Sequence, residues 1–77
     1  MNITLADLGV GEKGTVTLLR PPPERSCTLS RLGLTPGTEV TCLRRLPLGD
    51  PAVYRWRGID VALRRRDASR IEVLQKN

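Results

Sequence analysis

Residues 34–63, LTPGTEVTCLRRLPLGDPAVYRWRGIDVAL, decide the fold of this chain. Three runs in this stretch, residues 38–46, 52–57 and 59–63, alternate between two kinds of side chain, and a period of two is typical of strands. Turn signals stand before each run: Pro36-Gly37, then the segment LGDP, then Arg57-Gly58. The last two runs therefore predict a hairpin.

The alternation also predicts which side chains point inward. In the first run we expect Val40, Cys42 and Leu46 to share one face, and Thr41, Leu43 and Arg45 to share the other. In the second run the inward set includes both aromatic residues of the chain: Ala52, Tyr54 and Trp56. In the third run one face holds Ile59, Val61 and Leu63.

Short elements are expected on both sides of this stretch. Residues 4–8 predict one helical turn with Thr4 as its N-cap, and residues 15–19 predict a strand that ends at the proline run 21–23. Residues 26–34 predict a short helix that stops at Gly33. Downstream, residues 66–69 predict a helical turn and residues 71–74 a last strand. About five short strands with one or two short helices make a mostly β fold, a small, bent sheet or partly open barrel.

The length of the chain limits what the fold can do. At 77 residues it is long enough for one domain, which we expect to span residues 1–77. A core of this size is too thin to wall off a deep, dry pocket. The chain has no His to activate a serine or cysteine, and it has no phosphate-binding glycine motif. We therefore expect no catalytic residues, and a function in binding rather than in enzymatic catalysis.

The net charge of +5 is concentrated in one half of the sequence. Residues 44–70 hold eight Arg and three Asp, a balance that suits an acidic protein, a phosphate backbone or an anionic surface. Small basic barrels that bind nucleic acid stack bases on exposed aromatic rings, whereas both aromatic residues here are expected to point inward. Nucleic-acid binding is thus the main rival to a protein partner, and we do not expect it.

Metal and cofactor binding are not expected either. Cys27 and Cys42 lie fifteen positions apart, without the close spacing of a zinc site, and the carboxylates are scattered singly. The N-terminal residues do not resemble a signal peptide, and no apolar run is long enough to cross a membrane. We expect a reducing cytosol and reduced thiols.

Several segments resemble the ferrous iron transport protein A (FeoA) family. These are TLADL at residues 4–8, LSRLGLTPGT at 29–38, LGDP at 48–51 and RGIDVALR at 57–64. No single segment is specific, but their order and spacing together are. The resemblance covers nearly the whole chain.

The resemblance implies an SH3-like β-barrel in the bacterial cytosol. It implies an accessory or regulatory role in ferrous iron uptake through contact with a membrane ferrous-iron transporter that carries a GTP-binding domain, a FeoB-like protein. That contact would hold the chain at the inner face of the membrane, and self-association is an open alternative. The same fold forms a docking domain in iron-dependent repressors, so a docking or metal-sensing domain is the second interpretation.

We expect the partner surface where the short helix meets the barrel. On this hypothesis Leu29 or Leu34 is partly exposed, and basic side chains surround it: Arg31, Arg44, Arg64 and Arg65. The competing interpretation is that the leucines are core residues and the arginines ordinary surface residues.

Overall fold

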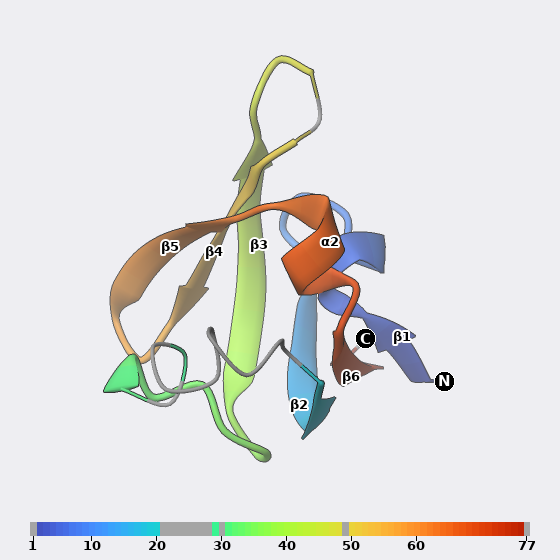
Figure 1. Ribbon diagram of the computed structural model, residues 1–77, viewed down its shortest axis with the longest axis vertical. Helices are drawn as coiled ribbons and strands as arrows, with labels where there is room; N and C mark the ends of the chain where they lie inside the picture. The colour runs from blue at the N-terminus through green and yellow to red at the C-terminus, as the bar shows by residue number, and fades with distance from the viewer. Residues whose placement is uncertain (1, 21–28, 30, 49, 77) are drawn as a thin grey trace.

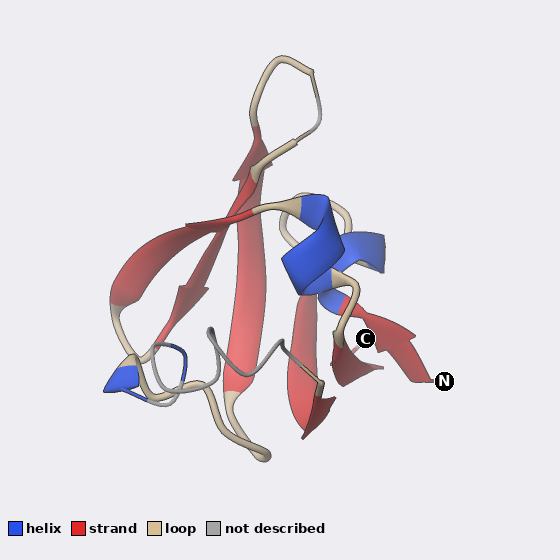
Figure 2. Ribbon diagram, viewed as in Figure 1, coloured by secondary structure: helices blue, strands red, loops and turns tan. Residues whose placement is uncertain are grey.

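The computed structural model describes residues 2–20, 29, 31–48 and 50–76. Within these residues six strands form one antiparallel sheet, in the order β1-β6-β2-β3-β4-β5. The strands are β1 (Asn2–Thr4), β2 (Lys13–Leu19), β3 (Glu39–Arg45), β4 (Ala52–Trp56), β5 (Ile59–Leu63) and β6 (Ile71–Lys76). The sheet is strongly bent, and two short helices, η1 (Leu5–Asp7) and α2 (Arg65–Ala68), lie beside one another at one side of it (Figures 1 and 2). The mostly β fold expected from the sequence is confirmed.

The predicted hairpin is β4 and β5. A two-residue turn joins them, and both of its residues have positive φ, 51° at Arg57 and 79° at Gly58. Two successive residues of this kind make the turn that matches the natural twist of a hairpin. The register aligns Tyr54 with Val61 and Arg55 with Asp60.

Strand β1 was not predicted, so the sheet has six described strands instead of about five. It contains only three residues and pairs with β6, where Ile3 faces Val73. On its other side β6 pairs with β2, so the N-terminal segment and the C-terminal strand lie in adjacent rows of the sheet (Figure 1).

The core lies inside the bend of the sheet and is mainly aliphatic. Tyr54 and Trp56 are fully buried within it, as the alternation predicts. The other largest buried side chains come from almost every described element: Leu5, Leu8, Val16, Leu34, Val40, Cys42, Ile71 and Val73.

One prediction about strand faces is wrong, and two further side chains have an exposure that alternation alone does not predict. Leu46 is 36% exposed, because the register shifts between Cys42 and Arg44 and β3 ends before residue 46. Ile59 is 37% exposed at the edge of the sheet. Val53 points to the outer face yet is only 7% exposed. The register places Arg44 beside it, and the aliphatic part of the arginine side chain can cover the Val53 side chain.

The helical turn predicted at residues 4–8 is confirmed as η1. The Asp7 carboxylate accepts hydrogen bonds from the amide and the hydroxyl of Thr4, at 3.0 and 3.1 Å. The buried Tyr54 hydroxyl donates to the Leu5 carbonyl at 3.1 Å, and the Arg45 guanidinium donates to the Ala6 carbonyl at 3.0 Å. Side chains from β3 and β4 therefore fix η1 against the barrel.

Of the helix predicted at residues 26–34, the described part is its end. Leu29 and Arg31 are helical, and the Leu34 amide donates to the Leu29 carbonyl at 3.0 Å around Gly33, whose φ is +84°. This is the glycine-terminated helix end that the sequence predicts. The proline run 21–23 and Cys27 lie outside the described residues.

Candidate functional site

The two leucines of the predicted partner surface are core residues. Leu29 is 5% exposed and Leu34 is 1% exposed. The chain turns back at Gly33, and this turn directs both side chains into the barrel. The expectation that one of them is exposed is therefore wrong.

The four arginines of that hypothesis are exposed but do not form one surface. Arg31 precedes Leu32, whose carbonyl is bonded to Trp56 at the turn end of the β4–β5 hairpin. Arg65 instead follows the other end of that hairpin, where Ala52 pairs with Leu63. Arg44 and Arg64 share the outer face of the sheet, on β3 and directly after β5. Arg65 follows Arg64, and its amide is capped by the Asp50 carboxylate at 2.8 Å.

The outer side of β3, β4 and β5 holds two of these arginines, Arg44 and Arg64, together with Arg55, and we call it the basic face. The cross-strand register places two rows of side chains on this face, Thr41-Arg55-Asp60 and Arg44-Val53-Ala62. Arg64 lies on the same face, directly after the end of β5. One of its arginines is paired with an acid: Arg55 donates to Asp60 through Nε at 2.7 Å and through Nη2 at 3.1 Å. Two guanidinium groups, those of Arg44 and Arg64, have no ion-pair partner among the described residues.

The charges of the basic face influence one another. The hydrogen bond from Arg55 is the main cause of a lowered pKa at Asp60. Burial acts in the opposite direction, and the positive charges of Arg55 and Arg44 lower the pKa further. The same pair raises the pKa of Arg55. Asp60 is therefore ionised at neutral pH and offsets one of the arginine charges.

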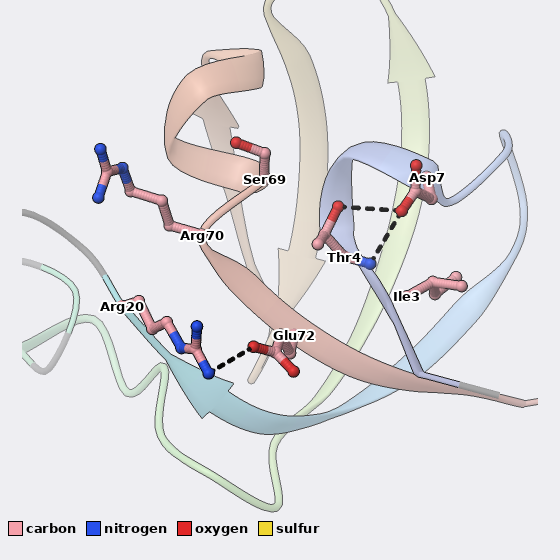
Figure 3. Close-up of a pocket in the computed structure, with 7 residues that line it drawn as sticks. All are labelled: Ile3, Thr4, Asp7, Arg20, Ser69, Arg70 and Glu72. Carbon is pink, nitrogen blue, oxygen red and sulfur yellow. Dashed lines mark hydrogen bonds and ion pairs between the residues drawn. The ribbon is translucent and has the colours of Figure 1, made fainter.

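A second candidate is a surface pocket of about 430 Å³ between η1, the end of β2 and the turn from α2 to β6 (Figure 3). Its lining combines acids, arginines and hydroxyls: Ile3, Thr4, Asp7, Arg20, Ser69, Arg70 and Glu72. Sequence reasoning did not single it out, because these residues come from distant parts of the chain and match no motif.

Most polar groups of this pocket are already engaged. Arg20 pairs with Glu72 at 3.3 Å, and Ser69 donates to the Arg66 carbonyl at 2.9 Å. Asp7 accepts from Thr4, while the Arg70 side chain points away from Asp7 and Glu72 (Figure 3). The lining therefore lacks the convergent polar groups that fix the orientation of a small ligand.

The structure offers little for a metal ion in the part of the chain that it describes. Those residues contain no group of three or more His, Cys, Asp or Glu side chains that could hold one. Cys42 is fully buried, and burial raises the pKa of its thiol, which disfavours the thiolate that metals require. Cys27 lies outside the described residues, so the expected absence of a metal or cofactor stays a prediction.

A strongly bent antiparallel sheet around a filled core, with its charges on the outside, defines this protein as a small β-barrel domain. The helices that the structure describes include none long and apolar enough to span a bilayer. The FeoA domain model matches residues 3–75, and the chain belongs to the FeoA family. It is a family of small proteins associated with transport and not a known enzyme family.

Solved structures agree with this assignment. FeoA from Chlorobium tepidum is 32% identical with a TM-score of 0.92, and the match covers 97% of this chain and 71% of that one. A crystal structure of an iron uptake regulatory protein (FeoA) is 28% identical with a TM-score of 0.84, covering 99% of both chains. Stenotrophomonas maltophilia FeoA complexed with zinc, described as an SH3 domain protein, is 25% identical with a TM-score of 0.79, covering 92% and 88%. The SH3-like barrel is thereby confirmed.

The fold also occurs outside the family. A manganese-dependent transcriptional repressor matches with a TM-score of 0.85 over 97% of this chain and 42% of its own, at 18% identity. At that identity the likeness shows the fold alone. A comparison with curated proteins gives no match.

Proposed function

We propose that this chain is a cytosolic accessory protein of bacterial ferrous iron uptake, which regulates a membrane ferrous-iron transporter by binding it and its GTP-binding domain. The observation that carries the proposal is the FeoA match over residues 3–75. A relative from Clostridium thermocellum is called iron(II) transport protein A, and the Stenotrophomonas relative is described in connection with ferrous iron transport activation. Binding to the transporter would bring the chain to the inner face of the membrane.

The structure supports action through the surface. Apolar side chains from nearly all described elements fill the core, and the pocket beside η1 is occupied by its own ion pair and hydrogen bonds. In contrast, Arg44, Arg64 and Arg65 are exposed and suit an acidic protein surface. Charge complementarity of this kind mainly speeds association and selects partners.

The repressor-like fold supports a second candidate, a docking domain that binds another protein of a transcriptional regulator. The two candidates differ in where the partner is found. A transporter is recovered with the membrane fraction, whereas a repressor is recovered with the soluble, DNA-binding fraction.

Affinity purification with the full chain as bait tests the proposal. Membranes solubilised from iron-limited cells of the source organism should yield the ferrous-iron transporter, identified by mass spectrometry. Charge reversal by Arg64→Glu with Arg65→Glu should reduce recovery several-fold, and more strongly at low salt than at high salt.

Lys13→Glu together with Arg31→Glu is the matched control. It makes the same change in net charge at exposed positions away from Arg64 and Arg65 and should leave recovery unchanged. If iron-limited membranes yield no transporter with the unmodified chain, the proposal is wrong. If the two double variants behave alike, Arg64 and Arg65 are not part of the contact.

A further inference from the structure

The outer edge of β5 has backbone groups without a hydrogen-bond partner among the described residues. β5 lies at the end of the strand order, so only β4 pairs with it among the described strands. The two-residue turn is closed by the pair Trp56 and Ile59, which makes this a hydrogen-bonded pair of the ladder. Because hydrogen-bonded and non-hydrogen-bonded pairs alternate, Asp60 and Ala62 turn their amides and carbonyls away from β4.

No described residue satisfies these groups. The backbone hydrogen bonds of the turns and loops include none to Asp60 or Ala62, and both residues are exposed. A short edge with free donors and acceptors is a template for an added strand. Four backbone groups, two donors and two acceptors, are thus available over three residues.

The side chains along this edge differ between its two faces. On the outer face the small side chain of Ala62 leaves room between Asp60 and Arg64. On the inner face Ile59 is 37% exposed and Val61 is half-buried. A strand laid along the edge would therefore meet apolar surface with every second side chain, and polar, charged surface with the others.

The charge around the edge is strongly positive. Residues 55–66 hold five Arg and one Asp, and 5 minus 1 gives a net charge of +4. The one acid, Asp60, is already bonded to Arg55. Arg64 follows the strand directly, and its side chain has no ion-pair partner among the described residues.

We propose that the outer edge of β5 binds an extended acidic segment of a partner protein, which adds to the sheet as an antiparallel or parallel strand. In this segment apolar residues that face Ile59 and Val61 alternate with acidic residues that face Ala62 and Arg64. The backbone groups of Asp60 and Ala62 supply the hydrogen bonds, and the arginines select for acidic side chains. A second copy of this chain is a poorer occupant, because it would bring two edges of net positive charge together. The inference concerns a binding mode and does not depend on which protein carries the segment.

Titration of the full chain with a synthetic peptide tests the inference. The probe is an acetylated, amidated hexapeptide of alternating glutamate and valine, and the readout is the amide NMR spectrum with hydrogen exchange. We expect the amides of Asp60 and Ala62 to exchange rapidly in the free chain, and to shift and exchange more slowly with the peptide. A lysine and valine hexapeptide should bind at least about fivefold more weakly.

The variant Ala62→Pro tests the backbone contact. It removes an amide that points away from β4, so the hairpin ladder is kept, and proline is tolerated on edge strands. Loss of this donor should weaken peptide binding by about fivefold or more, as expected for one hydrogen bond together with the bulk of the ring. Ala62→Thr, which keeps the amide, is the matched control and should bind about as well as the unmodified chain.

If Ala62→Pro does not fold, a peptide with alternate backbone nitrogens methylated tests the same contact. This peptide cannot form the full set of strand hydrogen bonds with β5 and should not bind. The inference is overturned if the acidic peptide shifts residues elsewhere, if the lysine peptide binds equally well, or if Ala62→Pro binds like Ala62→Thr. It is also overturned if the Asp60 and Ala62 amides are already protected in the free chain. Protection that grows with protein concentration would identify a second copy as the occupant.

Discussion

Trp56 donates its indole Nε1–H to the backbone carbonyl of Leu32 across 2.8 Å. The next residue, Arg57, donates its Nε–H to the following carbonyl, that of Gly33, at 2.9 Å. Two consecutive side chains at the tip of the β4–β5 hairpin thus hold two consecutive carbonyls at the end of the short helix. The contact joins segments 24 residues apart and fixes where the loop 34–38 enters β3.

Trp56→Phe should lower the free energy of unfolding by about 2 to 4 kcal/mol. The change leaves the part-buried Leu32 carbonyl without its donor and removes ring volume from the core. Urea denaturation followed by circular dichroism measures it, since the variant lacks the only Trp of the chain. Tyr54→Phe, which loses only a hydroxyl that donates to the Leu5 carbonyl, should cost less. A cost for Trp56→Phe below that of Tyr54→Phe would contradict this account.

Gly33→Ala should cost more stability than Gly37→Ala. Both glycines have positive φ, at 84° and 94°, so both substitutions carry backbone strain of about 1 kcal/mol or more. Only at position 33 would the new Cβ lie 2.6 Å from Arg57 Cδ, which forces the arginine to move and break its bond to the Gly33 carbonyl. At position 37 no atom of the described residues lies within 4 Å of a new Cβ.

The extra cost at position 33 should be about 0.5 to 1.5 kcal/mol, the value of one hydrogen bond. In an Arg57→Ala background that difference should disappear, because there is no longer a bond to lose. Chemical denaturation of the four variants measures it. A difference that persists without Arg57 would assign it to another cause.

The sequence predicts most of the sheet because period-two alternation and turn residues are local signals. The inward positions of Tyr54 and Trp56 and the turn at Arg57-Gly58 follow directly from them. Strand β1 was missed because three residues carry no measurable period. The exposure of Leu46 depends on a register shift in β3 that no local pattern announces.

The candidate surface was harder to predict than the fold. The apolar character of Leu29 and Leu34 does not show whether they point into the core or toward solvent. That depends on the direction of the turn at Gly33, which buries both side chains. The separation of Arg31 from Arg64 depends on the path of the whole sheet. The basic stretch at residues 44–70 does contain the arginines of the basic face, because several residues of that face lie on two strands joined by a two-residue turn.

The Arg55–Asp60 pair should give the chain a pH-dependent share of its stability. The pKa of Asp60 is lowered in the folded state, so the pair stabilises the fold above the ordinary Asp pKa, and this contribution is lost as pH falls through the folded value. The stability advantage of the unmodified chain over Asp60→Asn should therefore be present at neutral pH and vanish between about pH 5 and pH 2. Thermal unfolding across this range measures it.

The advantage should be small and should shrink in about 1 M salt, because both side chains are exposed. Arg55→Gln, which removes the partner of Asp60, provides the control background. In that background Asp60→Asn should change the pH profile little. A stability advantage over Asp60→Asn that grows as the pH falls would contradict this prediction.

The Cys42 thiol should react slowly in the folded protein. It is fully buried on β3, and burial raises its pKa, so both access and thiolate content are low. In a Cys27→Ser variant, where Cys42 is the only thiol, reaction with a water-soluble disulfide reagent should be at least about a hundredfold slower than in denaturant, because the barrel must open first. Because the pKa of Cys42 is raised in the folded state, the free energy of unfolding falls as the pH rises from the ordinary thiol pKa through the folded one. Cys42→Ala should therefore lose less stability at alkaline pH than the unmodified chain. Fast labelling under conditions where circular dichroism shows an intact fold would mean that β3 opens locally, and that its burial does not protect the thiol.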